Sequence, residues 1–298
     1  MSALALLFYS LLAYGNDFSA LETAIRSRNA AIAGLKPGNE TRLELESGSR
    51  TPTSFVYLHG FSASPKEASP LTESLAEERK ANAYFPLYRG HGIEGSDGLR
   101  GVTLADWERE TREALDNGRL LGNKVVVVAL STGASLALPA VLENSEQIAA
   151  LVLIAPNFRL HRWDSELLRL PFGGWLARLF LGEYREWKPK VEAQRDFWTT
   201  RYPAEVVVEV AKAAASARHA PLEDLKVPAF VAYSERDTVV HLPALKDAFA
   251  RLGSPKKELY PAERETLDGH VIAGDILAKE FTPVLQKRIS AFLRGLGL

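Results

Sequence analysis

Short, strongly apolar runs recur along this chain, and their spacing restricts its fold more than any other feature. Four runs rich in Val, Ala, Leu and aromatic residues stand out: Ser54–Leu58, Lys124–Leu130, Ala149–Ala155 and Val227–Tyr233. Strands that are buried on both faces have this character, because they lose the polar alternation of half-exposed strands. Weaker strand candidates lie at residues 41–46, 83–86 and 257–260.

Helical patterns fill the intervals between these runs. Apolar residues recur at three- and four-residue spacing, beside charged faces, over residues 66–80, 104–121, 134–143, 242–252 and 275–293. This alternation predicts an α/β fold, in which a mostly parallel central sheet carries helices on both faces. Ligands of such sheets bind at the carboxyl ends of the strands.

Residues 157–219 interrupt the alternation, because they contain no convincing strand run. They do contain four of the five tryptophans: Trp163, Trp175, Trp187 and Trp198. Two interpretations are open: a helical patch that covers a sheet edge, or a lid over a pocket, which aromatic side chains suit because they supply apolar area. We favour the lid. The chain is then one core domain, residues 41–156 and 220–298, with an inserted helical cap at 157–219.

Residues 1–40 comprise an apolar segment followed by a helix. Residues 3–15 have the length of a signal-peptide core, yet no Lys or Arg precedes them and no A-x-A site follows. They are also too short to span a bilayer as a helix. Two interpretations stay open: a helix packed on the domain of a cytoplasmic protein, or a trimmed export or anchoring segment. Contact with a membrane or lipid interface, through this segment or the cap, is a further hypothesis.

The composition excludes several classes of function. A formal net charge of −1 and a pI of about 6.6 predict no nucleic-acid partner. Because the chain has no cysteine, it has no thiolate metal site and no cysteine nucleophile. His161, His219 and His241 lack metal-ligand spacing, and no glycine-rich phosphate motif follows a strand, so we expect neither a metal nor a nucleotide cofactor.

Ser131 is the candidate nucleophile. It lies in Ala-Leu-Ser-Thr-Gly (129–133), directly after the strongest strand run and before a helical stretch. A G-x-S-x-G turn in this context raises the serine hydroxyl above the sheet, and small neighbours are needed because strand and helix crowd together there. Ala129 replaces the first glycine of that pattern, and we expect its methyl group to be tolerated.

A serine hydroxyl needs a general base and a carboxylate that orients the base. His270, in a loop between the last strand candidate and the final helix, is the best base. Asp237, in the turn after the run that ends at Tyr233, is the best carboxylate, and Glu235 in the same turn is its rival. Asp268 could tune the base or cap its loop. For four other carboxylates we expect solvated roles: Asp106, Asp116, Asp224 and Asp275.

Stabilisation of an oxyanion usually comes from two backbone N–H groups. Leu-His-Gly-Phe (58–61) follows an early strand, and Gly60 permits a sharp turn there. The N–H groups of Phe61 and Thr132 are therefore the expected donors. We expect a mainly structural role for the His59 side chain. The residues expected to border the substrate are His59, Gly60, Trp163 and Trp198.

Five motifs in order carry a resemblance: YLHGFSASP (57–65), PLYRGHG (86–92), ALSTGAS (129–135), SERDTVV (234–240) and DGHV (268–271). In these the chain resembles an α/β-hydrolase of the carboxylesterase and monoacylglycerol-lipase-like branch. The order Ser131, Asp237, His270 is also the order of that arrangement. The resemblance implies these three residues as a catalytic triad, Phe61 and Thr132 as oxyanion donors, and a shaping role for Gly90–Gly92.

The expected activity is hydrolysis of a carboxylic ester through an acyl-enzyme. The expected substrate is a small molecule with a small to medium acyl group, and monoacylglycerol-like esters are among the candidates. Related enzymes use the same triad on thioesters, amides and some carbon–carbon bonds, and this choice stays open. A protein that keeps the fold and binds ligands without turnover is the alternative from another class. The oligomeric state is not predicted.

Overall fold

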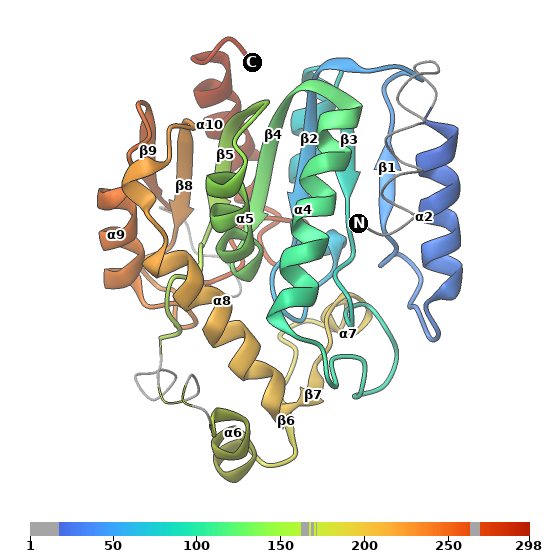
Figure 1. Ribbon diagram of the computed structural model, residues 1–298, viewed down its shortest axis with the longest axis vertical. Coiled ribbons are helices and arrows are strands. Elements are labelled where there is room, and N and C mark those ends of the chain that lie inside the picture. The colour runs from blue at the N-terminus through green and yellow to red at the C-terminus, as the bar shows by residue number, and fades with distance from the viewer. Residues whose placement is uncertain (1–17, 162–166, 168–169, 171, 263–268) are drawn as a thin grey trace.

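A seven-stranded sheet forms the centre of the computed structural model, which describes residues 18–161, 167, 170, 172–262 and 269–298 (Figure 1). The strand order is β1-β3-β2-β4-β5-β8-β9; β1 is antiparallel to β3, and every other neighbouring pair is parallel. The expected mostly parallel sheet is confirmed. The strands are β1 (Arg42–Glu44), β2 (Thr51–Leu58), β3 (Asn82–Phe85), β4 (Gly122–Leu130), β5 (Ile148–Ile154), β8 (Ala229–Tyr233) and β9 (Lys257–Pro261).

The central strands are strongly apolar where they are buried on both faces. In β4, side chains alternate between two core clusters. Val125, Val127 and Ala129 face one cluster. Val126, Val128 and Leu130 face the other. This alternation is the period-2 geometry of a strand, and it explains why residues 125–130 include no polar side chain.

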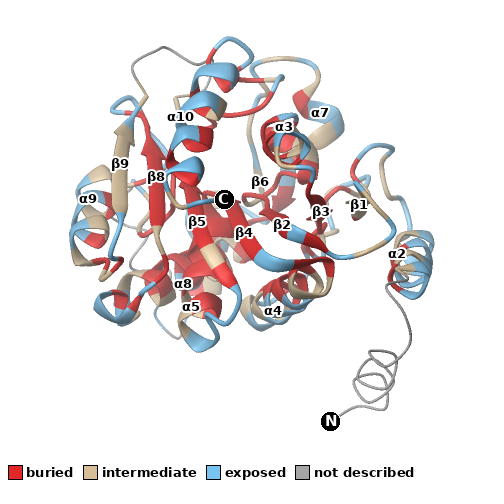
Figure 2. Cartoon of the chain, turned by 90° about the horizontal axis from the view of Figure 1, so that it is seen from above, coloured by how far each residue is buried: buried red, intermediate tan, exposed pale blue. Residues whose placement is uncertain are grey.

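Helices cover both faces of the sheet, as the sequence predicts (Figure 2). One face carries α4 (Leu104–Leu121), α5 (Thr132–Glu143), α8 (Val207–His219) and α9 (Leu242–Arg251). The other face carries α3 (Leu71–Glu78) and α10 (Thr282–Arg294). Helix α2 (Ser19–Ala31) lies at the β1 edge of the sheet (Figures 1 and 2).

The segment between β5 and β8 is not purely helical, so the expectation of no strand in it is wrong. Besides α8, its elements are α6 (Gly173–Leu181), β6 (Tyr184–Glu186), α7 (Gln194–Phe197), β7 (Arg201–Pro203) and the 3-10 turn η3 (Ala204–Val206). Strands β6 and β7 form a separate antiparallel pair. Each has three residues, which is too short for an alternating pattern to be recognised. Helix α8 packs against α5 and α4 within the helical layer.

Two expected helices have different boundaries in the structure. The pattern at 66–80 divides into the 3-10 turn η1 (Pro65–Ala68) and α3, and Pro70, which cannot continue a helix, lies between them. The final helix begins at Thr282 and not at Asp275, since residues 275–281 contain turns and Pro283 marks a helix start.

The apolar residues 3–15, on which the N-terminal interpretations depend, lie outside the described residues. Within the described part of the chain, every helix is too short or too polar to cross a membrane.

Candidate active site

Ser131 occupies a strained turn between β4 and α5. Its backbone has φ 52° and ψ −116°, a conformation that residues with a side chain rarely adopt. The Ser131 N–H donates to the Ile154 carbonyl at the end of β5 over 2.9 Å. Such strain persists only where the surroundings impose it, and it concentrates at functional sites.

A chain of two hydrogen bonds joins the three residues that the sequence singled out. Ser131 Oγ lies 2.9 Å from His270 Nε2, and His270 Nδ1 lies 2.7 Å from Asp237 Oδ2. Because a carboxylate accepts, Nδ1 carries the hydrogen, and Nε2 of the neutral ring can then accept the serine proton. This is the geometry of a nucleophile, a base and an orienting acid.

The sheet brings these residues together from distant parts of the sequence. Ser131 follows β4, Asp237 follows β8 and His270 follows β9. Parallel strands end at one edge of a sheet, so the loops after them meet there. All three side chains are buried. Burial strengthens the polar interactions among them, because the local dielectric constant is low.

Asp237, and not Glu235, faces the histidine. The Asp237 side chain is fully buried, and its Oδ1 accepts the N–H groups of Val239 (2.7 Å) and Val240 (3.0 Å). Glu235 is exposed and pairs with Lys246 at 2.8 Å. The hydrogen bonds from Lys246 and from the Tyr233 hydroxyl lower the pKa of Glu235. The Asp237 carboxylate therefore faces the buried His270 ring, whereas the Glu235 carboxylate is exposed beside Lys246.

The other sequence candidates have simpler positions. Trp163 and Asp268 lie outside the described residues. Asp106, Asp116 and Asp275 form ion pairs with neighbouring Arg or Lys side chains, and Asp224 belongs to a short 3-10 turn. Across the described residues, no three His, Asp or Glu side chains gather as metal ligands would.

The two expected oxyanion donors lie at the same small pocket. Its volume is about 10 Å³, close to the space that one water molecule needs. Among the described residues, no acceptor binds the N–H of Phe61 or that of Thr132, the first residue of α5. His59 and Gly60 also border the pocket. Trp198 does not; its side chain is buried in the core cluster beside α3 and α10.

The His59 ring orients the peptide that carries the Phe61 N–H. Its Nε2 accepts the Tyr88 N–H at 3.1 Å, so its Nδ1 holds the hydrogen and donates to the Gly60 carbonyl at 2.8 Å. Burial, aided by nearby His91, holds the pKa of His59 well below its usual value. A neutral ring keeps this tautomer, and the Gly60–Phe61 peptide keeps its orientation.

Close packing explains which small residues the elbow requires. A Cβ on Gly133 would lie 2.2 Å from the Leu58 carbonyl oxygen and 2.6 Å from that of His59, so only glycine fits. Ala129 is different, because its methyl group is part of the buried core between Leu58 and Leu153 on the neighbouring strands. The missing first glycine of the pattern therefore leaves no steric conflict.

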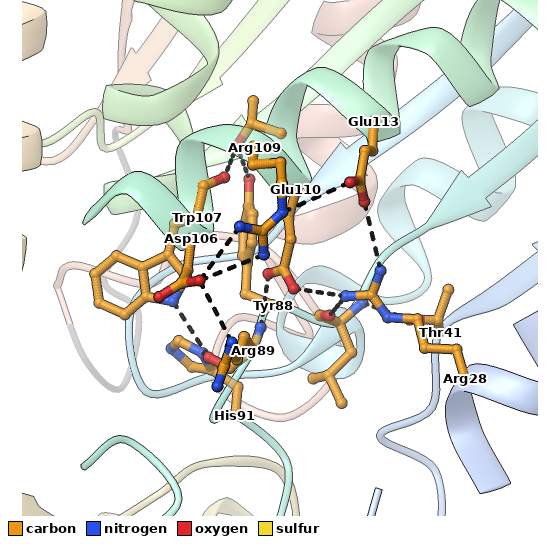
Figure 3. Close-up of polar contacts among 12 residues, drawn as sticks. Arg28, Thr41, Tyr88, Arg89, His91, Asp106, Trp107, Arg109, Glu110 and Glu113 are labelled. Carbon is orange, nitrogen blue, oxygen red and sulfur yellow. Dashed lines mark hydrogen bonds and ion pairs between the residues drawn. The ribbon is translucent and has the colours of Figure 1, made fainter. Parts of the chain in front are cut away.

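A buried glutamate holds the loop that forms the pocket wall (Figure 3). Glu110 of α4 accepts the Arg89 N–H at 2.7 Å through one carboxylate oxygen and Arg28 Nη2 of α2 at 2.9 Å through the other. The Trp107 indole N–H donates to the Arg89 carbonyl at 3.2 Å. Burial raises the pKa of Glu110, and the hydrogen bond from the Arg89 N–H and the Arg28 charge oppose this effect. Sequence analysis missed this contact, since Glu110 has the spacing of an ordinary helix residue.

His91, in the same loop, has a packing role. Its ring meets Phe61 edge to face, with centroids 5.9 Å apart, and also packs against Trp107. Burial lowers the pKa of His91 to about 4, so the ring is neutral near pH 7. This arrangement supports the shaping role expected for the Gly90–Gly92 turn.

Comparison with known proteins finds a matching family model and similar solved structures. A model of the alpha/beta hydrolase family matches residues 55–274. One of the metagenome-derived lipolytic enzymes LipS and LipT has a similar structure, with a TM-score of 0.72, 22% identity and coverage of 88% of this chain and 99% of that one. A Paleococcus ferrophilus monoacylglycerol lipase is also similar, with a TM-score of 0.63, 14% identity and coverage of 85% of this chain and 99% of that one. No curated protein matches the sequence. At these identities the likeness to solved structures shows the fold.

The elbow geometry predicts opposite tolerance at two small residues. We expect Gly133→Ala to lower the free energy of unfolding by about 3 kcal/mol or more, because the new methyl group would meet rigid backbone. Ala129→Gly loses one buried methyl group and should cost about 1–2 kcal/mol without loss of the site. Urea unfolding of both variants measures this. An equal loss of unfolding free energy in the two variants would contradict the steric requirement for glycine at residue 133.

The ion pair between Arg28 and Glu110 predicts that Arg28, on helix α2, stabilises the fold. Arg28→Met leaves a buried carboxylate without its cation, and we expect a loss of about 1–2 kcal/mol, since Arg28 itself is one-third exposed. The matched control is Arg112→Met, which breaks an exposed pair with Glu143 and should cost less than about 0.5 kcal/mol. If urea unfolding gives the same loss for both, Glu110 does not depend on Arg28.

Proposed function

The chain belongs to the alpha/beta hydrolase family, and on this premise we propose that it is a serine hydrolase acting on carboxylic esters. The observation that carries the proposal is the pair of hydrogen bonds that links Ser131, His270 and Asp237 at the strained turn after β4. The similarity to structures named as lipolytic enzymes and as a monoacylglycerol lipase supports the choice of esters.

In the proposed reaction, His270 Nε2 takes the proton of Ser131 as its oxygen attacks the ester carbonyl. The N–H groups of Phe61 and Thr132 stabilise the negative oxygen of the tetrahedral intermediate. His270 then donates the proton to the leaving alcohol, which departs and leaves an acyl-enzyme. Water repeats the sequence, with His270 again as base. Asp237 keeps the proton of the ring on Nδ1 and stabilises the imidazolium.

We also propose that the part of residues 157–219 before α8 forms a cap over the core, since α8 itself packs against α4 and α5 in the helical layer of that core. Contacts between this segment and the oxyanion turn support the proposal. The Tyr202 ring meets Phe61 edge to face at 5.0 Å, and the Thr199 N–H donates to the Ser62 carbonyl at 2.7 Å. A cap held in this way would limit the space for the acyl group next to the donors.

The hypothesis of contact with a lipid interface applies to α6 of this segment. Trp175 and Leu179 are exposed on one side of α6, and Ala177 on the other side is buried; Phe172 and Phe180 are exposed as well. Large apolar side chains on one side of a helix suit the boundary between water and lipid. This exposure supports the hypothesis, which binding to phospholipid vesicles would test.

Substitutions in the turn after β8 test the proposed acid. We expect Asp237→Asn to lower kcat by about a thousandfold or more, because the amide favours the wrong tautomer of His270. Glu235→Gln should change kcat by less than about threefold, since Glu235 is exposed and its partners among the described residues, Lys246 and Tyr233, are not part of the triad. Ser131→Ala defines the background rate. Hydrolysis of p-nitrophenyl butyrate measures all three variants. A larger loss in Glu235→Gln than in Asp237→Asn would contradict the proposal.

The proposed cap, whose Tyr202 ring packs on Phe61 beside the oxyanion donors, predicts a preference for short to medium acyl chains. Across p-nitrophenyl esters from acetate to palmitate, kcat/KM should be highest for the shorter chains and lowest for palmitate. A matching thioester and amide show whether the oxygen ester is the preferred bond. A maximum at palmitate, or faster cleavage of the thioester or amide than of the ester, would contradict the proposed substrate.

A further inference from the structure

Gly60 has no side chain because two other groups occupy the space. A Cβ on Gly60 would lie 2.9 Å from Glu67 Oε1 and 3.3 Å from the Cβ of Ser131. A glycine at this turn carries a cost, since it is the most flexible residue of the backbone. The peptides on its two sides, one of which bears the Phe61 N–H, must therefore be held by other interactions.

Two hydrogen bonds supply that restraint. The first, from His59 Nδ1 to the Gly60 carbonyl, fixes the peptide after Gly60. The second, from the Gly60 N–H to Glu67 Oε2 over 2.7 Å, fixes the peptide before it. The peptides before and after Gly60 are then both fixed, although Gly60 has no side chain.

Glu67 is unusual for a glutamate because it is 2% exposed. A buried carboxylate is stable only when polar groups replace its water. The Tyr57 hydroxyl donates to the same Oε2 at 3.1 Å. Burial, and then the Glu67 charge, raise the pKa of Tyr57 well above its usual value, so the hydroxyl keeps its proton and remains a donor. Hydrogen bonds to a charged acceptor are shorter and stronger than neutral ones.

The turn that carries Glu67 also touches the loop of His270. A Cβ on Gly274 would lie 2.2 Å from the Glu67 carbonyl oxygen, so the two backbones are in direct contact. The Asp275 N–H donates to the Ser69 carbonyl at 2.8 Å. Residues 65–69 are thus packed between the oxyanion turn and the loop that follows His270.

From this geometry we propose that Glu67 is a positioning residue, whose carboxylate holds Gly60 so that the Phe61 N–H stays directed at the oxyanion. The inference rests on the proposed function and adds a residue to it. The Phe61 N–H matters most when the substrate oxygen carries charge, so loss of its orientation should affect the transition state more than the bound ester.

Two substitutions separate the hydrogen bond from the volume of the side chain. Glu67→Gln keeps one neutral acceptor, and Glu67→Met keeps none. With p-nitrophenyl butyrate, we expect kcat to fall about tenfold in Glu67→Gln and about a hundredfold in Glu67→Met, while KM stays within about twofold. Affinity for a trifluoromethyl ketone, which forms a tetrahedral adduct with the serine, should fall in the same order. The matched control is Glu73→Gln on α3, a carboxylate paired with Arg42, for which we expect kcat within about twofold.

Titration with a fluorophosphonate counts active sites and corrects for misfolded protein. If Glu67→Met does not fold, Tyr57→Phe weakens the same carboxylate from its other side and should lower kcat about two- to fivefold at unchanged KM. If kcat per active site is normal in both Glu67 variants, the proposed role of Glu67 is overturned. If Glu67→Met does not fold, normal kcat in both Glu67→Gln and Tyr57→Phe overturns it. Absence of turnover in the unsubstituted protein would instead contradict the proposed function, and with it this inference.

Discussion

The hydrogen bond between His270 Nδ1 and Asp237 Oδ2 is the interaction on which the site depends. It determines which ring nitrogen carries the hydrogen, and it leaves Nε2 directed at the Ser131 hydroxyl. The parallel sheet makes this contact possible, since the loops after β4, β8 and β9 meet at one edge. Without that topology the three residues, which are far apart in sequence, would not form one site.

Around this centre, buried hydrogen bonds hold flexible backbone in one conformation. His59 and Glu67 restrain the two peptides of Gly60. Tyr88 sets the tautomer of His59, and Glu110 holds the loop to which Tyr88 belongs. Preorganised donors of this kind stabilise charge without reorganising during the reaction. The structure therefore relies on buried polar contacts where the chain turns, and on apolar packing where it is regular.

The central strands could be predicted because burial on both faces leaves a continuous apolar run, as in β4. The contact between Ser131 and His270 could be predicted because both follow strands whose carboxyl ends meet at one edge of the sheet. The start of α10 could not, since helical spacing continues through residues 275–281, which contain turns in the structure. Glu67 could not be found either, because a charged residue at helical spacing looks like one on a solvated face. Its burial depends on contacts with residues brought close only by the fold.

The proposed reaction requires Ser131 to form the covalent intermediate. The most direct measurement is peptide mapping by mass spectrometry after a fluorophosphonate has inhibited ester hydrolysis completely. We expect one phosphonyl group per chain, on the peptide that contains Ser131, and no labelling of Ser131→Ala. A phosphonyl group on another residue, or full inhibition with Ser131 unmodified, would contradict it.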